Sequence, residues 1–253
     1  YYQQTNQIAC SREWRNFVTQ HEDNDNLFGV LNGYPCCSCN MHQGWPKFTQ
    51  NLWYASRDGG LASFVYAPSV VTAEVADDVL GSLKQETFYP FDETVKVTVN
   101  FPSKKVRNAY FPLYFRIPEW CHDAKVSVNG ETAYESPVAG ETVRICRRWN
   151  KGDVITLVFP MEVRISHWYD GATVVERGPL VYALRMEEKW EKHEFEASYE
   201  GKYGPYYYTC MSDTPWNYGF RLKDMNTPEL IAENFKVEVR HDGGLYPWNL
   251  ENA

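Results

Sequence analysis

From Leu61 onward the sequence consists mainly of short segments that are rich in β-branched and aromatic residues and are bounded by Pro, Gly or Asp. Segments of this length and composition are typical of β-strands. Short strands that recur about every ten residues, with turn signals between them, predict an antiparallel β-sandwich, so the fold class is mainly β. The segments that we predict as strands are 61–67, 70–75, 83–89, 94–100, 110–117, 125–128, 142–146, 153–159, 161–167, 173–176, 180–184 and 235–240.

Two of these segments carry the strand pattern most clearly. Val95, Val97 and Val99 alternate with polar residues, which indicates one buried and one exposed face. Asn129-Gly130 directly follows the segment 125–128, and this dipeptide is the strongest short-range signal for a β-hairpin. We interpret residues 203–208, in contrast, as a loop rich in tyrosine.

Helix is expected mainly at about residues 42–57, where apolar residues recur every three or four positions. These apolar residues are Trp45, Phe48, Leu52 and Ala55. Pro46 is tolerated in a first turn, and Asp58-Gly59-Gly60 is a typical helix end.

Composition and charge argue against several classes of partner. The chain has 253 residues, of which 43% are hydrophobic, so it can bury a sizeable core in one large domain or two smaller ones. The net charge is −8 and no run of Lys or Arg exists, which argues against nucleic acid and anionic membranes. No apolar stretch is long enough for a membrane span, so membrane insertion is not expected. The first residue is Tyr1 and nothing resembles a signal peptide, so we expect the chain to begin inside a longer protein.

Three of the seven cysteines, Cys36, Cys37 and Cys39, lie within four positions directly ahead of the predicted helix. They are metal ligands, a reactive nucleophile or simply buried thiols. Thiolates favour zinc or iron–sulfur centres, and a tetrahedral zinc site would need at least one further ligand from elsewhere. The other four cysteines have no spacing that implies a disulfide framework, and the redox compartment stays open. They are Cys10, Cys121, Cys146 and Cys210.

The stretch 33–48 resembles the cysteine motif of the β-L-arabinofuranosidase family, glycoside hydrolase family 127 and relatives such as family 146. The matching residues are Cys36-Cys37, then Asn40, Met41-His42-Gln43-Gly44-Trp45-Pro46-Lys47-Phe48. Further matches are Tyr66-Ala67-Pro68-Ser69, Arg116-Ile117-Pro118-Glu119-Trp120, Glu176-Arg177-Gly178-Pro179-Leu180-Val181-Tyr182 and Trp216-Asn217-Tyr218. The resemblance therefore covers most of the chain.

This resemblance implies a catalytic (α/α) toroid followed by β-sandwich domains. Residues 1–58 would be the end of the toroid, 59–170 a β-sandwich domain, and 171–253 a second, incomplete β domain. The parent protein would be a zinc- and cysteine-dependent retaining glycoside hydrolase whose carbohydrate substrates are L-arabinofuranosides or related glycans.

In the family, zinc is bound by a Glu, an upstream Cys and the Cys-Cys pair, whose first Cys is the nucleophile. The resemblance thus assigns the nucleophile and a zinc ligand to Cys36, and a second zinc ligand to Cys37. The upstream Glu-x-Cys ligands and the acid/base Glu have no counterpart here, so a preceding catalytic segment would supply them and the fragment alone should be inactive. Cys39 departs from the family pattern, and either replaces a missing ligand or is merely packed.

Other polar and aromatic residues leave two readings each. Asn40 and His42 either cap the helix or contact thiolates and sugar hydroxyls. The carboxylates Glu119, Glu162 and Glu176 lie near strand ends, but no spacing identifies an acid/base couple. The aromatic runs 167–169 and 203–208 either stack on sugars or fill the core.

Three functions therefore remain open. The chain is part of a glycoside hydrolase, a non-catalytic carbohydrate-binding or architectural β-sandwich, or a thiol-based redox or structural zinc module. The last finds support in the Cys-x-x-Cys spacing of Cys36 and Cys39.

Overall fold

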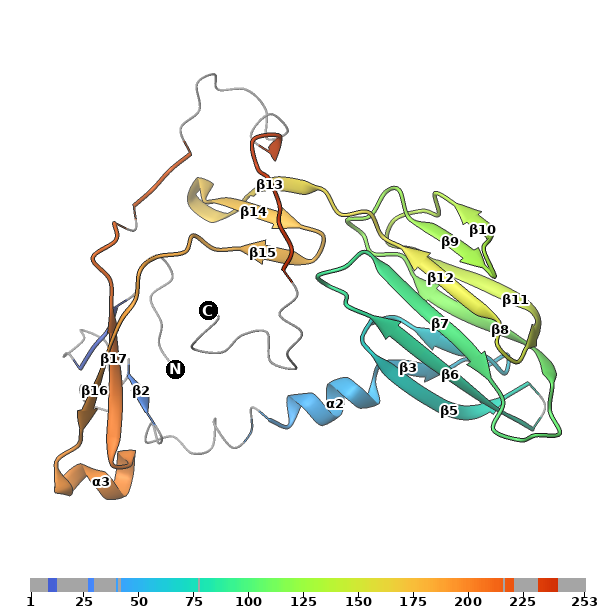
Figure 1. Ribbon diagram of the computed structural model, residues 1–253, viewed down its shortest axis with the longest axis horizontal. Helices are drawn as coiled ribbons and strands as arrows, with labels where there is room; N and C mark the ends of the chain where they lie inside the picture. Colours follow the sequence, from blue (N-terminus) through green and yellow to red (C-terminus); the bar gives the residue numbers. More distant parts are fainter. Residues whose placement is uncertain are drawn as a thin grey trace. The chain divides into compact units, whose positions relative to one another are not determined.

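The computed structural model describes residues 9–12, 27–29, 40, 42–76, 78–215, 217–220 and 232–240 (Figure 1). The chain divides into two compact units, Tyr1–Lys47 with Ala183–Lys223, and Phe48–Tyr182 with Asp224–Ala253. Each unit is described by itself below. The domain boundaries that we predicted after residues 58 and 170 stay predictions.

The second unit contains the predicted β-sandwich. In the part of the chain that the structure describes, one sheet has the strand order β10-β9-β12-β7-β6-β5 and the other β11-β8-β4-β3. Their pairings are antiparallel except for β4, which runs parallel to β8. The strands are β3 (Trp53–Ala55), β4 (Leu61–Ser63), β5 (Ser69–Val75), β6 (Val79–Thr87), β7 (Thr94–Asn100), β8 (Asn108–Arg116), β9 (Lys125–Val128), β10 (Glu131–Glu135), β11 (Thr142–Asn150) and β12 (Val154–Val158).

Alternating side chains from these strands form one hydrophobic core. Val95, Val97 and Val99 on β7 are fully buried, which confirms the predicted alternation. They share the core with the aromatic residues Phe111 and Phe115 of β8. Burying each large apolar side chain contributes about 1.5–3 kcal/mol, so this core is the main source of stability.

The predicted hairpin at Asn129-Gly130 is confirmed. It joins β9 to β10, and both turn residues have positive φ, 53° and 85°. The Asn129 side chain also accepts a hydrogen bond from the Val154 amide at 2.8 Å and donates one to Asp153 at 3.0 Å. The turn is therefore anchored to the neighbouring strand β12.

The predicted helix is confirmed only over α2 (Gly44–Gln50), and the prediction for residues 51–57 was wrong. The chain there forms strand β3, which pairs with β4. The Trp53 indole donates a hydrogen bond to the Ser69 hydroxyl at 3.1 Å, and its ring packs against the core. These tertiary contacts outweigh the helical spacing of the apolar residues.

The segment 58–60 is consequently the turn of a hairpin and not a helix end. Gly59 has a φ of 74°, and Gly60 lies so close to β8 that an added Cβ would be 2.1 Å from the Pro112 carbonyl oxygen. Asp58 accepts hydrogen bonds from Tyr114 at 2.6 Å and from Arg144 at 3.1 Å. A hydrogen bond from Ser56, followed by the one from Tyr114, lowers the pKa of Asp58 to about 2.

A third antiparallel sheet follows the sandwich in the same unit. It consists of β13 (Val163–His167), β14 (Thr173–Arg177) and β15 (Leu180–Tyr182). The short 3-10 helix η1 (Tyr169–Gly171) lies between β13 and β14.

The first unit contains a small antiparallel sheet around β17 (Tyr206–Met211). This strand pairs with β16 (Lys189–Glu194), β1 (Ala9–Cys10) and β2 (Phe28–Gly29). The helix α3 (Ala197–Tyr203) connects β16 to β17. The prediction that residues 203–208 form a loop was therefore wrong, because these tyrosines end a helix and begin a strand. The rings of Tyr203 and Tyr207 pack on Phe195 in a small cluster of their own.

The predicted strand at 235–240 was also wrong, since these residues form no regular element. Of the three apolar side chains on its alternating face, Phe235 and Val239 are exposed and Val237 is half-buried. An alternating pattern favours a strand mainly through burial of one face, and this face is buried only in part. No helix in the described part of the chain is long and apolar enough to cross a membrane.

Replacing Gly60 with Ala should destabilise the chain by about 1–3 kcal/mol or more, because the new Cβ overlaps the backbone of β8. Urea unfolding followed by circular dichroism measures this loss.

Gly44→Ala is the matched control. A Cβ at Gly44 meets nothing within 4 Å, and Ala is favoured over Gly in a helix, so this variant should be at least as stable as the parent. Equal unfolding free energies for Gly60→Ala and the parent would contradict the close approach of the two strands.

Candidate functional site

The predicted nucleophile and metal ligands, Cys36 and Cys37, lie outside the described residues, as does Cys39. Their roles therefore stay predictions. Among the described residues, no three His, Cys, Asp or Glu side chains gather in a group that could hold a metal ion.

The residues that directly follow the cysteines are described, and they lie at the surface. Asn40 is exposed, and its side-chain oxygen accepts a hydrogen bond from the side-chain amide of Gln43 at 2.7 Å. His42 is also exposed, and its carbonyl accepts a hydrogen bond from the Trp45 amide at 3.2 Å. Helix α2 has no buried residue, and Trp45 is 68% exposed. The cap and the substrate-contact interpretations of Asn40 and His42 both stay open.

The motif 66–69 contributes packing and hydrogen bonds to the sandwich core. Tyr66 is buried, and its hydroxyl donates a hydrogen bond to the Arg116 carbonyl at 2.5 Å. Burial raises the pKa of this hydroxyl far above its usual range. The Tyr66 ring lies 5.1 Å from the ring of Phe159, centroid to centroid. The side-chain amide of Gln85 donates a hydrogen bond to the backbone carbonyl of Ala67 at 2.8 Å. The motif 66–69 is thus joined to the motif 116–120 inside the sandwich.

The motif 176–182 fastens the third sheet to the sandwich. Arg177 pairs with Glu93 at 2.9 Å, and only 13% of the Arg177 side chain is exposed. The same Glu93 oxygen accepts a hydrogen bond from the backbone amide of Met161 at 3.0 Å. Gly178 has a φ of 57°, and a Cβ there would lie 2.7 Å from the Met161 sulfur. This position therefore requires glycine both for its backbone conformation and for space.

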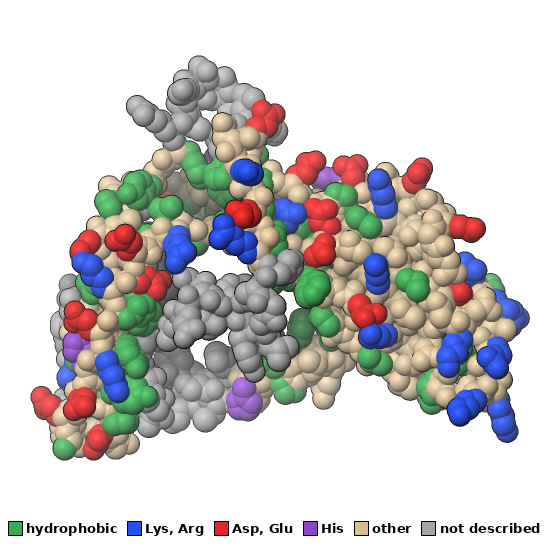
Figure 2. Space-filling view, viewed as in Figure 1, with side chains coloured by type: hydrophobic (Ala, Val, Ile, Leu, Met, Phe, Trp, Pro, Cys, Tyr) green, Lys and Arg blue, Asp and Glu red, His purple; other side chains and the backbone are tan. Residues whose placement is uncertain are grey.

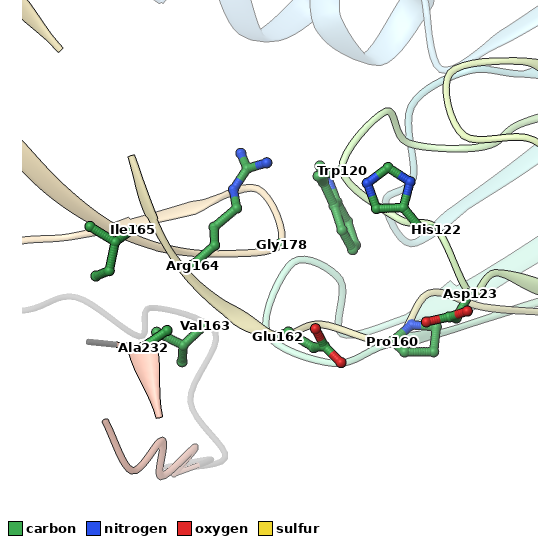
Figure 3. A pocket seen from close by; sticks show the side chains of 10 residues that line it. All are labelled: Trp120, His122, Asp123, Pro160, Glu162, Val163, Arg164, Ile165, Gly178 and Ala232. Atoms are coloured by element: carbon green, nitrogen blue, oxygen red, sulfur yellow. The ribbon is translucent and has the colours of Figure 1, made fainter. Parts of the chain in front are cut away.

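A cavity of about 260 Å³ lies where the sandwich meets the start of β13 (Figure 3). Charge alone does not mark a site on the face shown in Figure 2, where acidic and basic side chains are interspersed over the sandwich. The residues lining the cavity are Trp120, His122, Asp123, Pro160, Glu162, Val163, Arg164, Ile165, Gly178 and Ala232.

Trp120 forms an aromatic wall of this cavity and is held by the core behind it. Its ring meets Phe159 edge to face, with centroids 6.5 Å apart. Burial raises the pKa of the Tyr89 hydroxyl, and a hydrogen bond with the Trp120 side chain partly opposes that rise. Trp120 therefore has a fixed orientation, although it is only half-buried.

Arg164 extends along the other side of the cavity (Figure 3). Its Nε lies 2.7 Å from Oε2 of Glu176, whose side chain is only 9% exposed. The two atoms are at ion-pair distance, although no group in the described part of the chain donates a well-aligned hydrogen bond to that oxygen. The buried carboxylate favours a position of the guanidinium at the cavity, where 53% of the Arg164 side chain is exposed.

The acidic groups of the cavity, Glu162 and Asp123, lie on either side of Pro160 (Figure 3). Of the three carboxylates considered from the sequence, Glu162 thus lines the cavity, Glu176 lies behind Arg164, and Glu119 is exposed and not part of the lining. An aromatic face, a cationic donor and carboxylate acceptors around a small volume suit a ring-sized ligand that carries several hydroxyls.

Sequence reasoning missed the cavity. Trp120 belongs to a motif that we quoted, which was the available signal for it. Arg164 had no signal, because no spacing in the sequence relates it to Trp120, whereas Asp123 lies three residues after Trp120 and was overlooked.

A family model and several solved structures are similar to parts of this chain. Residues 60–161 match the family model described as β-L-arabinofuranosidase, GH127 middle domain. No curated protein matches the chain.

Among solved structures, a GH127 β-L-arabinofuranosidase from Geobacillus stearothermophilus T6 is 26% identical with a TM-score of 0.52, and the alignment covers 75% of this chain and 32% of that one. A structure titled glycoside hydrolase is 23% identical with a TM-score of 0.53, covering 81% of this chain and 40% of that one. A GH127 β-arabinofuranosidase is 22% identical with a TM-score of 0.50, covering 69% and 35%. The last two likenesses show the fold alone. The chain spans between about a third and two fifths of the length of these structures.

Replacing Arg177 with Gln should destabilise the chain by about 1–3 kcal/mol, because it removes the charged hydrogen bond that the mostly buried Arg177 side chain donates to Glu93. Thermal and urea unfolding measure the effect.

Arg148→Gln is the control, since Arg148 is exposed and bonds only the exposed Asn108 side chain in the described part of the chain. This change should stay within about 0.5 kcal/mol. A loss for Arg177→Gln no larger than for Arg148→Gln would show that the Glu93–Arg177 pair does not fasten the third sheet.

Proposed function

Because residues 60–161 match the family model described as β-L-arabinofuranosidase, GH127 middle domain, we propose that the chain is part of a glycoside hydrolase acting on L-arabinofuranosides or a related glycan. The observation that carries this proposal is the agreement between the family match and the fold. The matched residues form strands β4 to β12 of one sandwich, and the solved GH127 arabinofuranosidase shares this fold at 26% identity. The activity is proposed for the whole protein, since the chain spans 32% of that relative.

We assign the chemistry to the cysteine motif. The Cys36 sulfur attacks the anomeric carbon of the sugar, and the bond from that carbon to the leaving-group oxygen breaks. A carboxylic acid donates its proton to the departing oxygen. The resulting carboxylate then takes a proton from water, whose oxygen attacks the same carbon and releases the Cys36 thiolate. Retaining glycosidases ordinarily use a carboxylate as nucleophile, and a thiolate can replace it when its pKa is low enough.

Cys36 and Cys37 form a donor set that fits zinc, because thiolates are preferred ligands of that metal. A bound zinc ion would keep both sulfurs deprotonated near neutral pH. A tetrahedral site needs two more ligands, and the described residues offer no group of metal-binding side chains to provide them. We propose that a Glu and a Cys outside residues 1–253 complete the site, with Cys39 as the alternative donor. The acid/base carboxylate is proposed to lie outside residues 1–253 as well, so these residues alone should be inactive.

In the full-length protein, Cys36→Ser should lower kcat on an aryl L-arabinofuranoside by about 10⁴-fold or more, because a hydroxyl is a far weaker nucleophile than a thiolate. Covalent labelling by an arabinofuranose-like electrophile should disappear as well. Steady-state kinetics and intact-protein mass spectrometry measure the two effects.

Cys121→Ser is the control, because Cys121 is buried in the sandwich and should leave kcat unchanged when the protein folds. Elemental analysis of the same samples should show less zinc in Cys37→Ser than in Cys121→Ser. A loss of only a few fold in Cys36→Ser would place the nucleophile on another residue.

A second function, carbohydrate binding without catalysis, is favoured by the cavity at Trp120. A sugar ring would stack on the face of Trp120. Arg164 would donate hydrogen bonds to the oxygens of the sugar, and Asp123 or Glu162 would accept hydrogen bonds from its hydroxyls. This function needs neither the cysteines nor a metal, so it separates cleanly from the hydrolytic one.

Trp120→Ala should weaken the binding of arabino-oligosaccharides to the 253-residue chain about tenfold, through loss of the stacking surface. Isothermal titration calorimetry measures the affinity. The matched control is Trp168→Ala, since Trp168 is 65% exposed and lies outside the cavity. Equal losses in the two variants, or no binding by the parent chain, would remove the Trp120 cavity as a sugar site.

A further inference from the structure

Two of the cysteines that are distant in sequence face each other in the small sheet of the first unit. Cys10 on β1 lies directly opposite Cys210 on β17 in the antiparallel register. Directly opposed residues of an antiparallel pair place their side chains on the same face of the sheet. Both side chains are buried, with 6% and 2% exposed, and neither cysteine is in a disulfide.

The backbone spacing of such a pair suits a covalent bond between the sulfurs. Opposed residues in antiparallel strands have Cα atoms about 4.5 or 5.5 Å apart, depending on the hydrogen-bonding position. Disulfides span Cα distances of about 4.4–6.8 Å. The two strands therefore need no large movement for the sulfurs to join.

The electrostatic surroundings agree with this proximity. Burial, followed by the charges of Glu188 and Cys10, raises the pKa of the Cys210 thiol to about 11. Cys10 is thus close enough to Cys210 to influence its ionisation. Cys121 and Cys146 belong to the sandwich unit, where Cys121 on its own is buried against the Pro160 carbonyl.

We propose that Cys10 and Cys210 are an oxidative modification site, and that they form a disulfide when the protein meets a small-molecule disulfide such as oxidised glutathione. One cysteine loses its proton and attacks a sulfur of oxidised glutathione, which forms a mixed disulfide and releases one glutathione thiolate. The second cysteine loses its proton and attacks the protein sulfur of the mixed disulfide, which releases the other glutathione thiolate. The two protein thiols give up two electrons, oxidised glutathione accepts them, and the two released thiolates take up the two protons.

The disulfide would fix the segment that precedes the cysteine motif. β2 also pairs with β17, through Phe28 and Gly29 opposite Tyr208 and Tyr207. Residues 10 and 28 are therefore both attached to one strand, and Cys36 follows eight residues after Phe28. A disulfide between Cys10 and Cys210 would make the attachment of β1 to β17 covalent for as long as the two cysteines stay oxidised.

The test is to incubate the folded 253-residue chain with oxidised glutathione, alkylate the remaining thiols and map the digest without reduction. The expected result is a peptide containing Cys10 linked to one containing Cys210, which disappears after treatment with dithiothreitol. The melting temperature should rise by about 5–15 °C in the oxidised protein, because the link closes a long loop in the unfolded chain.

Cys10→Ser and Cys210→Ser should each abolish the link and the rise in melting temperature, whereas Cys121→Ser should keep both. The mapping of the parent chain needs no variant, so it decides the question even when a serine variant fails to fold. Alkylation of both cysteines after oxidation would overturn the proposal, and so would a link from Cys10 to Cys36, Cys37 or Cys39.

Discussion

Burial of apolar side chains between two facing sheets is the interaction on which the described structure of the second unit depends. Val95, Val97 and Val99 contribute from one sheet, and Phe111 and Phe115 from the other. Two of the sequence motifs that carry the family resemblance act within this arrangement. Tyr66 bonds the Arg116 backbone across the core, and Trp120 packs on Phe159. The described role of these motifs is therefore to maintain the sandwich. The cavity at Trp120 is a by-product of the same packing, because the core fixes the ring that forms its wall.

Most of the sandwich could be predicted from the sequence. Apolar residues alternate along its strands with a period of two, and its turns contain residues that favour specific turn conformations. Asn129-Gly130 is an example in which two residues determine a hairpin. Predictions failed where a distant partner decided the outcome. Residues 53–55 have helical spacing, yet they form a strand because residues 61–63 offer hydrogen bonds and Ser69 receives the Trp53 indole. Residues 235–240 have a strand-like pattern, yet they form no strand, and Phe235 and Val239 are exposed.

The candidate sites were predictable to different degrees for the same reason. The cysteine motif is contiguous in the sequence, so a resemblance could identify it, and its roles stay predictions. The cavity combines Trp120 with Arg164, and no spacing in the sequence relates these two residues. Cys10 and Cys210 are separated by most of the chain, and only the register of β1 on β17 makes them neighbours. Chemistry built from separate strands is visible only after the strands are paired.

The pairing of β17 imposes an order on synthesis and folding. Every strand of the sandwich, from β3 to β12, has been synthesised once residue 158 has been added to the chain. The sheet of the first unit cannot form at that stage, because the partner strand of β1 and β2 is β17, which begins at Tyr206. The start of the chain therefore remains without its sheet partner while a complete sandwich core can already assemble. Contacts of such long sequence separation also form slowly, since a large loop must close first. The segment that leads to the cysteine motif is thus among the last parts of the chain to gain its native neighbours.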